Sequence, residues 1–315
     1  MSLIRKALVT GASGLLGSNL ALEMSAGWDV CAQYHRHTLV SDRMRCVQSD
    51  LSDDRTAAEL IEREQPDLVV HCAALTHVDT CEKQPVLAFK LNASMAENVA
   101  RAARQAGAYL VHVSTDAVFD GERGGYVESD PVNPPNVYAR SKVKGEELVL
   151  EANPGAAVLR VNIFGWNAQP KFSLAEWFLD KLERKLGCRG FTDVYVTPTL
   201  VNALVPLIEK MAGEKTRGIV HAAGADCISK YEFGVRIASA FGLDSSLIEP
   251  AKVEEVGLLA PRGRKLCLES ERMIPELGIQ PLDLEEGLGR MRSLRENGYT
   301  ASLKDLFKGG SHEGT

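Results

Sequence analysis

The feature that most constrains the fold is an alternation of short apolar runs with longer helical patterns through the first half of the chain. Runs this apolar predict strands that are buried on both faces, as in parallel sheets that helices cover on both sides. We therefore predict an α/β fold built on a doubly wound parallel sheet with right-handed crossovers. The expected strands are 6–10, 28–34, 45–50, 67–74, 108–115 and 156–165, and the expected helices are 15–27, 55–65, 85–107 and 137–152.

A glycine-rich segment, TGASGLLG (10–17), lies where the first strand meets the first helix. Gly11 can form the tight turn, Gly14 lets the backbone approach a diphosphate, and Gly17 allows the helix to pack closely on the strand. The free N–H groups at the helix N-terminus would then bind the anion. The segment predicts a Rossmann-type dinucleotide site, and the alternative is a glycine turn that serves packing alone. The residues expected to bind the cofactor here are Gly11, Ser13, Gly14, Leu15, Leu16 and Gly17.

The end of the second strand bears on which nicotinamide cofactor binds. An acidic residue there would accept hydrogen bonds from a ribose 2′-hydroxyl, whereas an arginine accommodates a 2′-phosphate. The sequence YHRHT (34–38) contains Arg36 and no carboxylate, which favours NADP(H) and leaves NAD(H) as the alternative. Arg36 could also simply point into water. The other residues expected against the cofactor follow the third and fourth strands: Asp50 and Leu51 at the adenine, then Cys72, Ala73 and Ala74.

Beyond about residue 166 the alternation loosens, and the segment 245–282 is rich in Pro, Glu and Arg with little periodicity. We expect residues 1–165 to form the dinucleotide-binding domain, with some later segments returning to its sheet. Residues 166–307 would form a smaller C-terminal α/β part that binds substrate, and 308–315 would be a disordered tail.

The composition argues against several classes of protein. The chain has 315 residues, of which 45% are hydrophobic and 25% charged, as in a soluble globular protein. A net charge of -6 argues against nucleic-acid binding. No apolar run approaches the roughly 20 residues that span a bilayer, and no signal peptide begins the chain. Seven scattered cysteines predict free thiols in a reducing cytoplasm, and seven histidines without a His-x-x-x-His pair predict no metal site.

Residues 134–145 (PPNVYARSKVKG) begin a new helix with a tyrosine and a lysine one turn apart. Tyrosine is a poor acid at neutral pH because its ordinary pKa is about 10. A lysine ammonium beside it favours the phenolate and is expected to bring that pKa towards the working range. Tyr138 and Lys142 are therefore candidate catalytic residues. The alternative is that Tyr138 packs in the interior and Lys142 is a solvated helix residue.

Together with STDAVFDG (114–121) and YARSK (138–142), the glycine-rich segment resembles the extended short-chain dehydrogenases/reductases. Within them, the chain is most similar to the dTDP-4-dehydrorhamnose reductase group. The likeness covers nearly the whole chain and is strongest before about residue 145. Further segments similar to that group are HCAALTHVDTCEKQP (71–85), ESDPVNPPNVYARSK (128–142), TDVYVTPT (192–199) and GIVHAAGADCISKYEFG (218–234).

The resemblance implies roles for several of these residues. Tyr138 would donate a proton to a sugar ketone, and Lys142 would bind the nicotinamide ribose and tune Tyr138 electrostatically. Thr115 would hydrogen-bond the carbonyl oxygen and polarise it, unless it only caps a turn. Asn92 would hold a water or kink its helix near the lysine and the cofactor, or else be a plain surface residue. Asp116 would reach a sugar hydroxyl.

Two departures from the family pattern concern the substrate. The family often has a tryptophan after the sixth strand, where this chain has Ile163 beside the expected cofactor, so a different sugar contact is expected. The family's Arg-Pro pair appears as Ala260-Pro261, so Arg262 or Arg264 would have to supply the guanidinium that binds a nucleotide diphosphate. The alternative is that this basic segment is a solvated loop. The residues expected to bind substrate are Thr76, Asp116, Asp193, Arg262 and Arg264.

These features predict a cytoplasmic, NADPH-dependent reductase of a nucleotide-linked 4-keto-6-deoxy sugar in polysaccharide biosynthesis. One alternative is an NAD-dependent nucleotide-sugar epimerase or dehydratase, although the usual Asp-Glu pair after Thr115 is absent. Another is a non-catalytic NADP-binding regulatory subunit, a role of some relatives, against which the intact set of Thr115, Tyr138 and Lys142 argues. The expected partner is the nucleotide-sugar substrate, with no nucleic acid and no membrane, and a homodimer is left open.

Overall fold

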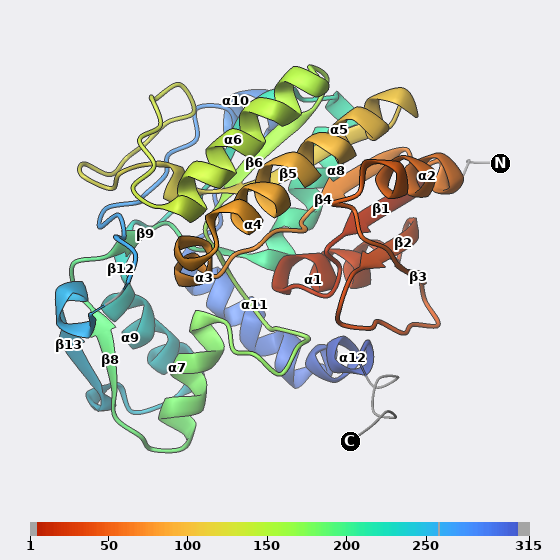
Figure 1. Ribbon diagram of the computed structural model, residues 1–315. Helices are drawn as coiled ribbons and strands as arrows, with labels where there is room; N and C mark the ends of the chain where they lie inside the picture. The colour runs from red at the N-terminus through yellow and green to blue at the C-terminus, as the bar shows by residue number, and fades with distance from the viewer. Residues whose placement is uncertain (1–4, 258, 308–315) are drawn as a thin grey trace.

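A computed structural model describes residues 5–257 and 259–307, so the tail expected at 308–315 lies outside the described residues. Its centre is a seven-stranded sheet with helices on both faces (Figure 1). Every strand pair in this sheet is parallel, in the order β11-β6-β5-β4-β1-β2-β3, which confirms the predicted doubly wound α/β fold. The strands are β1 (Lys6–Thr10), β2 (Asp29–Tyr34), β3 (Arg45–Gln48), β4 (Leu68–His71), β5 (Tyr109–Thr115), β6 (Ala157–Val161) and β11 (Gly218–Ala222).

Alternate residues of each strand pack into two separate apolar cores, one on each face of the sheet. Val9 and Val70 belong to the first core, and Leu8 and Val69 to the second. The helices that contribute to the first core include α1 (Leu15–Met24) and α8 (Leu204–Glu214). Those that contribute to the second are α2 (Asp54–Glu64), α5 (Met95–Gln105) and α6 (Val137–Ala152). Both faces are therefore buried, which explains the continuous apolar runs in the sequence.

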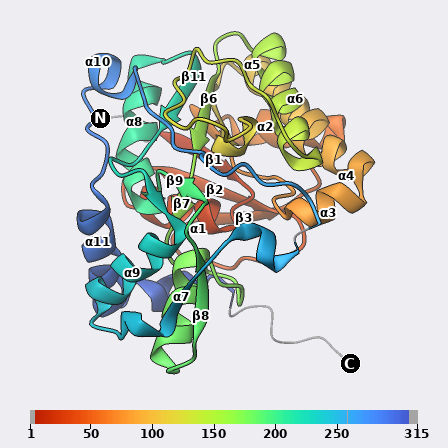
Figure 2. The same ribbon diagram turned by 90° about the vertical axis from the view of Figure 1, so that its left-hand side faces the viewer.

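A smaller group of elements packs beside the sheet and fills the lower part of Figure 1 and Figure 2. In it, β8 (Cys188–Phe191) pairs in parallel with β13 (Ile248–Ala251). Two further pairs join β7 (Ile163–Phe164) to β10 (Thr199–Leu200) and β9 (Tyr195–Val196) to β12 (Ile228–Ser229). The helices of this part are α7 (Leu174–Glu183), α9 (Lys230–Phe241), α11 (Leu284–Glu296) and α12 (Tyr299–Asp305). None of the described helices combines the length and apolar character that a membrane crossing requires.

The helix expected over 85–107 is interrupted. It consists of α4 (Pro85–Phe89), a π-helical turn (Lys90–Ser94) and α5, and the short helix α3 (Val78–Lys83) precedes it. Gly145 of α6 packs against this turn so closely that a Cβ there would lie 2.2 Å from the carbonyl oxygen of Asn92. The strand expected over 156–165 is also divided, into β6 and β7. Helical periodicity could not reveal the turn, because it adds a residue to the helix without ending it.

The expectation that all the cysteines are free thiols is wrong for one pair. Cys227 and Cys267 form a disulfide, with Cα atoms 5.5 Å apart and a sequence separation of 40. Cys31, Cys46, Cys72, Cys81 and Cys188 are free. The pair could not be predicted from the sequence, because only the fold brings Cys227, just before β12, next to the segment that contains Cys267.

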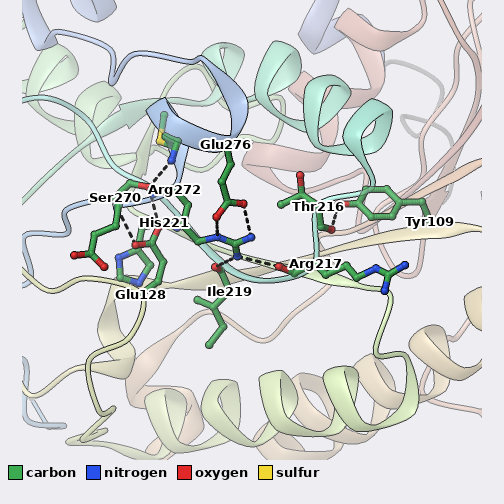
Figure 3. Close-up of polar contacts among 11 residues, drawn as sticks. Tyr109, Glu128, Thr216, Arg217, Ile219, His221, Ser270, Arg272 and Glu276 are labelled. Carbon is green, nitrogen blue, oxygen red and sulfur yellow. Dashed lines mark hydrogen bonds and ion pairs between the residues drawn. The ribbon is translucent and has the colours of Figure 1, made fainter.

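Side chains cover the outer edge of β11, with which no other strand pairs among the described residues (Figure 3). Arg272 donates to the carbonyl oxygens of Arg217 (2.9 Å) and Ile219 (2.6 Å) and pairs with Glu276 in α10 (Met273–Leu277). Glu128 accepts from the backbone N–H of His221 at 3.0 Å. These contacts occupy two carbonyl oxygens and one N–H group at the edge of the sheet and hold the segment around Arg272 against it.

Candidate active site

The glycine-rich segment turns at the carboxyl end of β1 and packs against the chain that follows β4. Gly11 has a φ of +62°, which favours glycine, and a Cβ there would lie 2.6 Å from the Cα of Ala73. A Cβ on Gly17 would lie 2.4 Å from the carbonyl oxygen of Gly11. The N-cap of α1 is Gly14, and no side chain caps the first turn, so its N–H groups are available to an anion. This arrangement fits the diphosphate of a dinucleotide.

Gln33, which no sequence motif marks, braces this segment from β2. Its Oε1 accepts from the N–H of Gly11 at 3.0 Å, and its Nε2 donates to the carbonyl oxygen of Ser49 at 2.7 Å. The side chain is buried and so links the glycine turn to the ends of β2 and β3. The one signal in the sequence is a glutamine within an otherwise apolar strand.

The residues expected at the adenosine end of the cofactor lie beyond β2 and β3. Arg36 is exposed, and that it contacts a 2′-phosphate stays a prediction. The Asp50 side chain is half exposed, and hydrogen bonds from Ser52 hold its pKa below the usual value. His35 lies 4.0 Å from Asp50, while Leu51 is buried in the core beneath.

The other residues expected at the cofactor lie nearer the middle of the sheet. Cys72, Ala73 and Ala74 directly follow β4 and are half-buried. Burial raises the pKa of the Cys72 thiol to about 12, so this cysteine is a small inert side chain. Ile163 is half-buried in β7. In the glycine-rich segment, the carbonyl oxygen of Ser13 accepts a hydrogen bond from Nε2 of Gln169 at 2.6 Å.

Helix α6 begins at Val137 because Asn136 caps it. The Oδ1 of Asn136 accepts from the N–H of Ala139, and its Nδ2 donates to the carbonyl oxygen of Pro261, both at 2.9 Å. The cap therefore fixes both the start of the helix and the segment of chain that crosses it. Tyr138 stands in the first turn and Lys142 one turn later, on the same side of the helix.

Lys142 is 2% exposed and has two protein partners. Its Nζ donates to the carbonyl oxygen of Val113 at 2.7 Å and lies 3.3 Å from Nε2 of His112. Burial lowers the pKa of Lys142 to about 8, and the charge of Glu146 partly opposes that shift. The solvated-lysine alternative is therefore wrong.

The structure corrects the expected effect of Lys142 on Tyr138. Burial raises the pKa of Tyr138, a hydrogen bond with Thr115 lowers it, and the charge of Asp116 raises it again. The Lys142 ammonium points instead at Val113 and His112. The phenol is therefore protonated at neutral pH and can act as a proton donor.

Thr115 and Asp116 form a hydrogen-bonded group beside Tyr138. The Thr115 hydroxyl donates to Oδ1 of Asp116 (3.0 Å) and accepts from the N–H of Ala117 (3.1 Å). Asn162, which the sequence did not point to, donates to Oδ2 of Asp116 at 2.6 Å. Burial raises the pKa of Asp116 to about 6, against the effect of these hydrogen bonds.

Asn92 is 1% exposed, which excludes the surface alternative. It lies in the π-helical turn, where its Oδ1 accepts from the N–H of Leu75 at 2.7 Å. Its Nδ2 donates to the carbonyl oxygen of Leu75 (3.0 Å) and to Oγ of Ser141 (2.9 Å). Asn92 thus joins the segment after β4 to Ser141 of α6, the residue that precedes Lys142.

The two arginines of PRGRK (261–265) have different surroundings. Arg262 donates through Nη2 to Oδ1 of Asp79 at 2.9 Å, while its Nη1 is buried with no hydrogen-bond partner among residues 5–257 and 259–307. Arg264 pairs instead with Glu254 (2.8 Å) and Asp193 (3.6 Å). Arg264 therefore faces two carboxylates, whereas Arg262 keeps a buried donor without a partner among the described residues.

Thr76 is exposed just before α3. No contact in the described structure connects it with Tyr138 or Arg262, so its role stays a prediction.

Lys230 lies in the segment 218–234 that resembles the family, although no site role was predicted for it, and it brings another cation close to Asp116 and Arg262. It is the first residue of α9, and burial lowers its pKa while the charge of Asp116 raises it and that of Arg262 lowers it. The disulfide joins Cys227, three residues before Lys230, to Cys267, five residues after Arg262. The fold thus fastens together the two segments that carry these cations.

Comparisons with known proteins show which family shares this arrangement. Residues 5–295 match the RmlD substrate binding domain family. The probable low-salt glycan biosynthesis reductase Agl14 of Haloferax volcanii is 32% identical over 293 residues, which cover 91% of this chain and 97% of that protein. The methionine adenosyltransferase 2 subunit beta of Xenopus laevis is 35% identical over 262 residues, which cover 80% of this chain and 77% of that protein.

A solved structure with the same fold is dTDP-4-dehydrorhamnose reductase from Bacillus anthracis in complex with NADP. It superposes with a TM-score of 0.83 at 27% identity, over 92% of this chain and 99% of that one. These findings confirm the resemblance to the dTDP-4-dehydrorhamnose reductase group of the extended short-chain dehydrogenases/reductases. They also confirm the predicted enzyme class, an NAD(P)-dependent oxidoreductase of that type. The chain belongs to the RmlD substrate binding domain family.

Proposed function

We propose that this protein is an NADPH-dependent reductase of a nucleotide-linked 4-keto-6-deoxy sugar, with Tyr138 as the proton donor. The observation that carries the proposal is the protonated phenol of Tyr138 within hydrogen-bonding reach of Thr115, with the buried cation of Lys142 one turn along the same helix. Membership of a family that includes sugar-nucleotide reductases supports the same reaction.

Reduction of a ketone adds a hydride to the carbonyl carbon and a proton to the oxygen, so the donor must keep its proton until the hydride arrives. The raised pKa of Tyr138 meets that requirement. The Thr115 hydroxyl has a single proton, which it donates to Asp116 in this structure. To hold the carbonyl oxygen beside the phenol, it would turn that proton from Asp116 to the substrate. Ala117 follows Asp116, so the site lacks the carboxylate pair of a dehydratase, and this favours reduction.

The bound nicotinamide would supply the hydride, and the chain supplies the contacts that hold the cofactor. The glycine turn and the first turn of α1 would bind its diphosphate. Lys142 uses two of its three N–H donors on protein atoms, which leaves one for the ribose.

The choice of NADPH depends on Arg36. Arg36→Glu is expected to weaken NADPH binding about tenfold or more and to leave NADH binding within about twofold, because only NADPH carries the 2′-phosphate. Titration calorimetry measures both constants. Arg189→Glu, an equal charge change at an exposed residue of β8, is the control. Equal losses for both cofactors would contradict the assignment of NADPH.

On the substrate side, two residues have donors open to a nucleotide diphosphate. Arg262 keeps a buried Nη1 without a partner among the described residues, and Lys230 is electrostatically coupled to it. Asp116 and Asn162 would hydrogen-bond the hydroxyls of the sugar. Cationic donors for a diphosphate next to neutral and acidic groups for sugar hydroxyls support a substrate in which a charged diphosphate is attached to an uncharged sugar.

The test is the loss of NADPH absorbance with a nucleotide-linked 4-keto-6-deoxy sugar. Tyr138→Phe is expected to lower kcat by about 10²–10⁴-fold and to leave the Kd for NADPH unchanged. Tyr109→Phe is the matched control, because this buried hydroxyl donates to the carbonyl oxygen of Thr216 at 2.6 Å, away from the site (Figure 3). Turnover of Tyr138→Phe at the wild-type rate would refute the proposal.

A second candidate is a non-catalytic NADP-binding regulatory subunit, which the 35% identity to methionine adenosyltransferase 2 subunit beta favours. This candidate predicts that the wild-type protein binds NADPH, oxidises none with any nucleotide keto sugar, and changes the kinetics of a methionine adenosyltransferase catalytic subunit. NADPH oxidation together with unchanged transferase kinetics would exclude it.

A further inference from the structure

Three polar side chains form a row on the face of the sheet that α5 and α6 cover. Thr10, His71 and His112 stand opposite one another in the register of β1, β4 and β5. The Thr10 hydroxyl lies 2.8 Å from Nδ1 of His71, and the rings of His71 and His112 stack with their centroids 5.3 Å apart. Because Nε2 of His112 lies 3.3 Å from Nζ of Lys142, the row connects the residue before Gly11 with Lys142.

The contact with Lys142 fixes the proton on His112. An ammonium has only donors, so Nε2 of His112 accepts and the ring proton is on Nδ1. Both imidazoles are 1% exposed, and burial, followed by the charge of Lys142, lowers the pKa of each, that of His71 to about 3. Both rings are therefore neutral at neutral pH, and His112 is available as an acceptor throughout the working range.

Stability alone does not account for these residues. The Nδ1 of His112 and the Nε2 of His71 are buried without a hydrogen-bond partner among the described residues, which is unfavourable. Two residues earlier on the same face, β4 and β5 carry Val69 and Leu110, which pack in the apolar core. Apolar residues at 71 and 112 would continue that core at no such penalty, so the row is better explained by what it does for Lys142.

Among the residues that the structure describes, the other charged and titratable groups around Lys142 leave His112 as its one side-chain acceptor. Glu146, one turn along α6, raises the Lys142 pKa by its charge, but its oxygens accept from Arg160 and Ser114. The Cys72 thiol, after β4, is protonated because burial raises its pKa. Tyr138, one turn earlier on α6, is a neutral phenol.

We propose that His112, oriented by His71 and Thr10, is a positioning residue that keeps the Lys142 ammonium protonated and fixed in place for the reaction. Without the acceptor, the buried ammonium would keep only the carbonyl oxygen of Val113. The benefit to catalysis rests on the proposed reductase function. The charge state of Lys142, however, is a property of the free protein.

The first test follows Lys142 by NMR titration of ¹³C-labelled lysine side chains in the full chain, with Lys142→Met to assign the signal. The wild-type midpoint is expected at about 8. His112→Leu is expected to lower it by about one pKa unit or more. His112→Gln, whose amide oxygen can take the place of Nε2, should restore it. Val111→Ala, a buried truncation on the opposite face of β5, should leave it unchanged.

The second test is the pH profile of kcat/KM, whose alkaline limb should move down in His112→Leu by the same amount as the NMR midpoint. An unchanged Lys142 midpoint in His112→Leu, or a His112→Gln midpoint as low as that of His112→Leu, would overturn the proposal. If His112→Leu shows no cooperative thermal unfolding, His112→Asn, too short to reach Nζ, takes its place under the same criteria. If no variant and no wild-type protein turns over a keto sugar, the proposed function fails, and the NMR midpoints still decide the role of His112.

Discussion

The buried ion pair between Glu146 and Arg160 gives a quantitative test of how α6 is held to the sheet. Its two side chains are 5% and 2% exposed, and Arg160 donates to Glu146 through Nη2 (2.7 Å) and Nε (3.1 Å). Ser114 also donates to Glu146. On its other side, the Arg160 guanidinium lies 5.2 Å from the ring centroid of Phe119 and 3.4 Å from Nε2 of His221.

Glu146→Ala is expected to lower the free energy of unfolding by about 3–5 kcal/mol, because it leaves the Arg160 charge buried without a counter-ion. The Ser114 hydroxyl also loses its acceptor, which places the expected loss towards the upper end of that range. The ring of Phe119 and the neutral imidazole of His221 remain, but neither carries the negative charge that the guanidinium needs. Urea unfolding followed by circular dichroism, extrapolated to water, measures the difference.

The control is Glu146→Met/Arg160→Met, which removes both charges and keeps the volume apolar. We expect it to recover at least about half of the loss, because replacing a whole buried pair is far less costly than breaking it. Glu214→Ala, which removes an exposed partner of Lys210, should change stability by less than about 0.5 kcal/mol. A loss below about 1 kcal/mol for Glu146→Ala, or equal losses for the single and double variants, would refute the reasoning.

Three further predictions concern the glycine turn, the disulfide and Asp116. Gly17→Ala should weaken NADPH binding at least about tenfold, because the new Cβ would lie 2.4 Å from the Gly11 carbonyl oxygen. As the control, Gly27→Ala should leave the Kd for NADPH unchanged, because a Cβ there would meet no atom within 4 Å. Cys227→Ser should lower the free energy of unfolding by about 3–4 kcal/mol, as expected for a 40-residue separation, and a reductant should lower the stability of the wild type alone. Burial raises the pKa of Asp116 from 3.8 to about 6, so the folded state binds the carboxyl proton more tightly than the unfolded chain does. The protonated Asp116 therefore contributes stability at low pH, and this contribution is lost as the pH rises from about 4 to about 6. Asp116→Asn should abolish that part of the pH dependence, about 3 kcal/mol, in urea unfolding at both ends of the window, and equal slopes in the two proteins would contradict it.

Much of the fold could be predicted from the sequence because the sheet is buried on both faces. Apolar runs such as 108–115 and the glycines of TGASGLLG carry that information locally, and the helix expected at 137–152 has those same bounds in the structure. The π-helical turn at Lys90–Ser94 and the Cys227–Cys267 disulfide were missed. Each depends on segments far apart in the chain that pack together, as Gly145 does against Asn92.

The residues around Lys142 show why the site was harder to predict than the fold. Lys142 and Tyr138 are one turn apart on a helix, so their proximity is local, but proximity does not decide which group the ammonium faces. His112 and Thr10 become neighbours of the same row only through the register of three parallel strands, and a chain with different crossovers would separate them. The sign of the Tyr138 pKa shift was also wrong, because burial raises that pKa and the Lys142 ammonium is directed at Val113 and His112 instead of the phenol. A short motif therefore indicates which side chains lie on the same surface. Their protonation depends on burial and on neighbouring groups, and here the register of the strands determines which groups are neighbours.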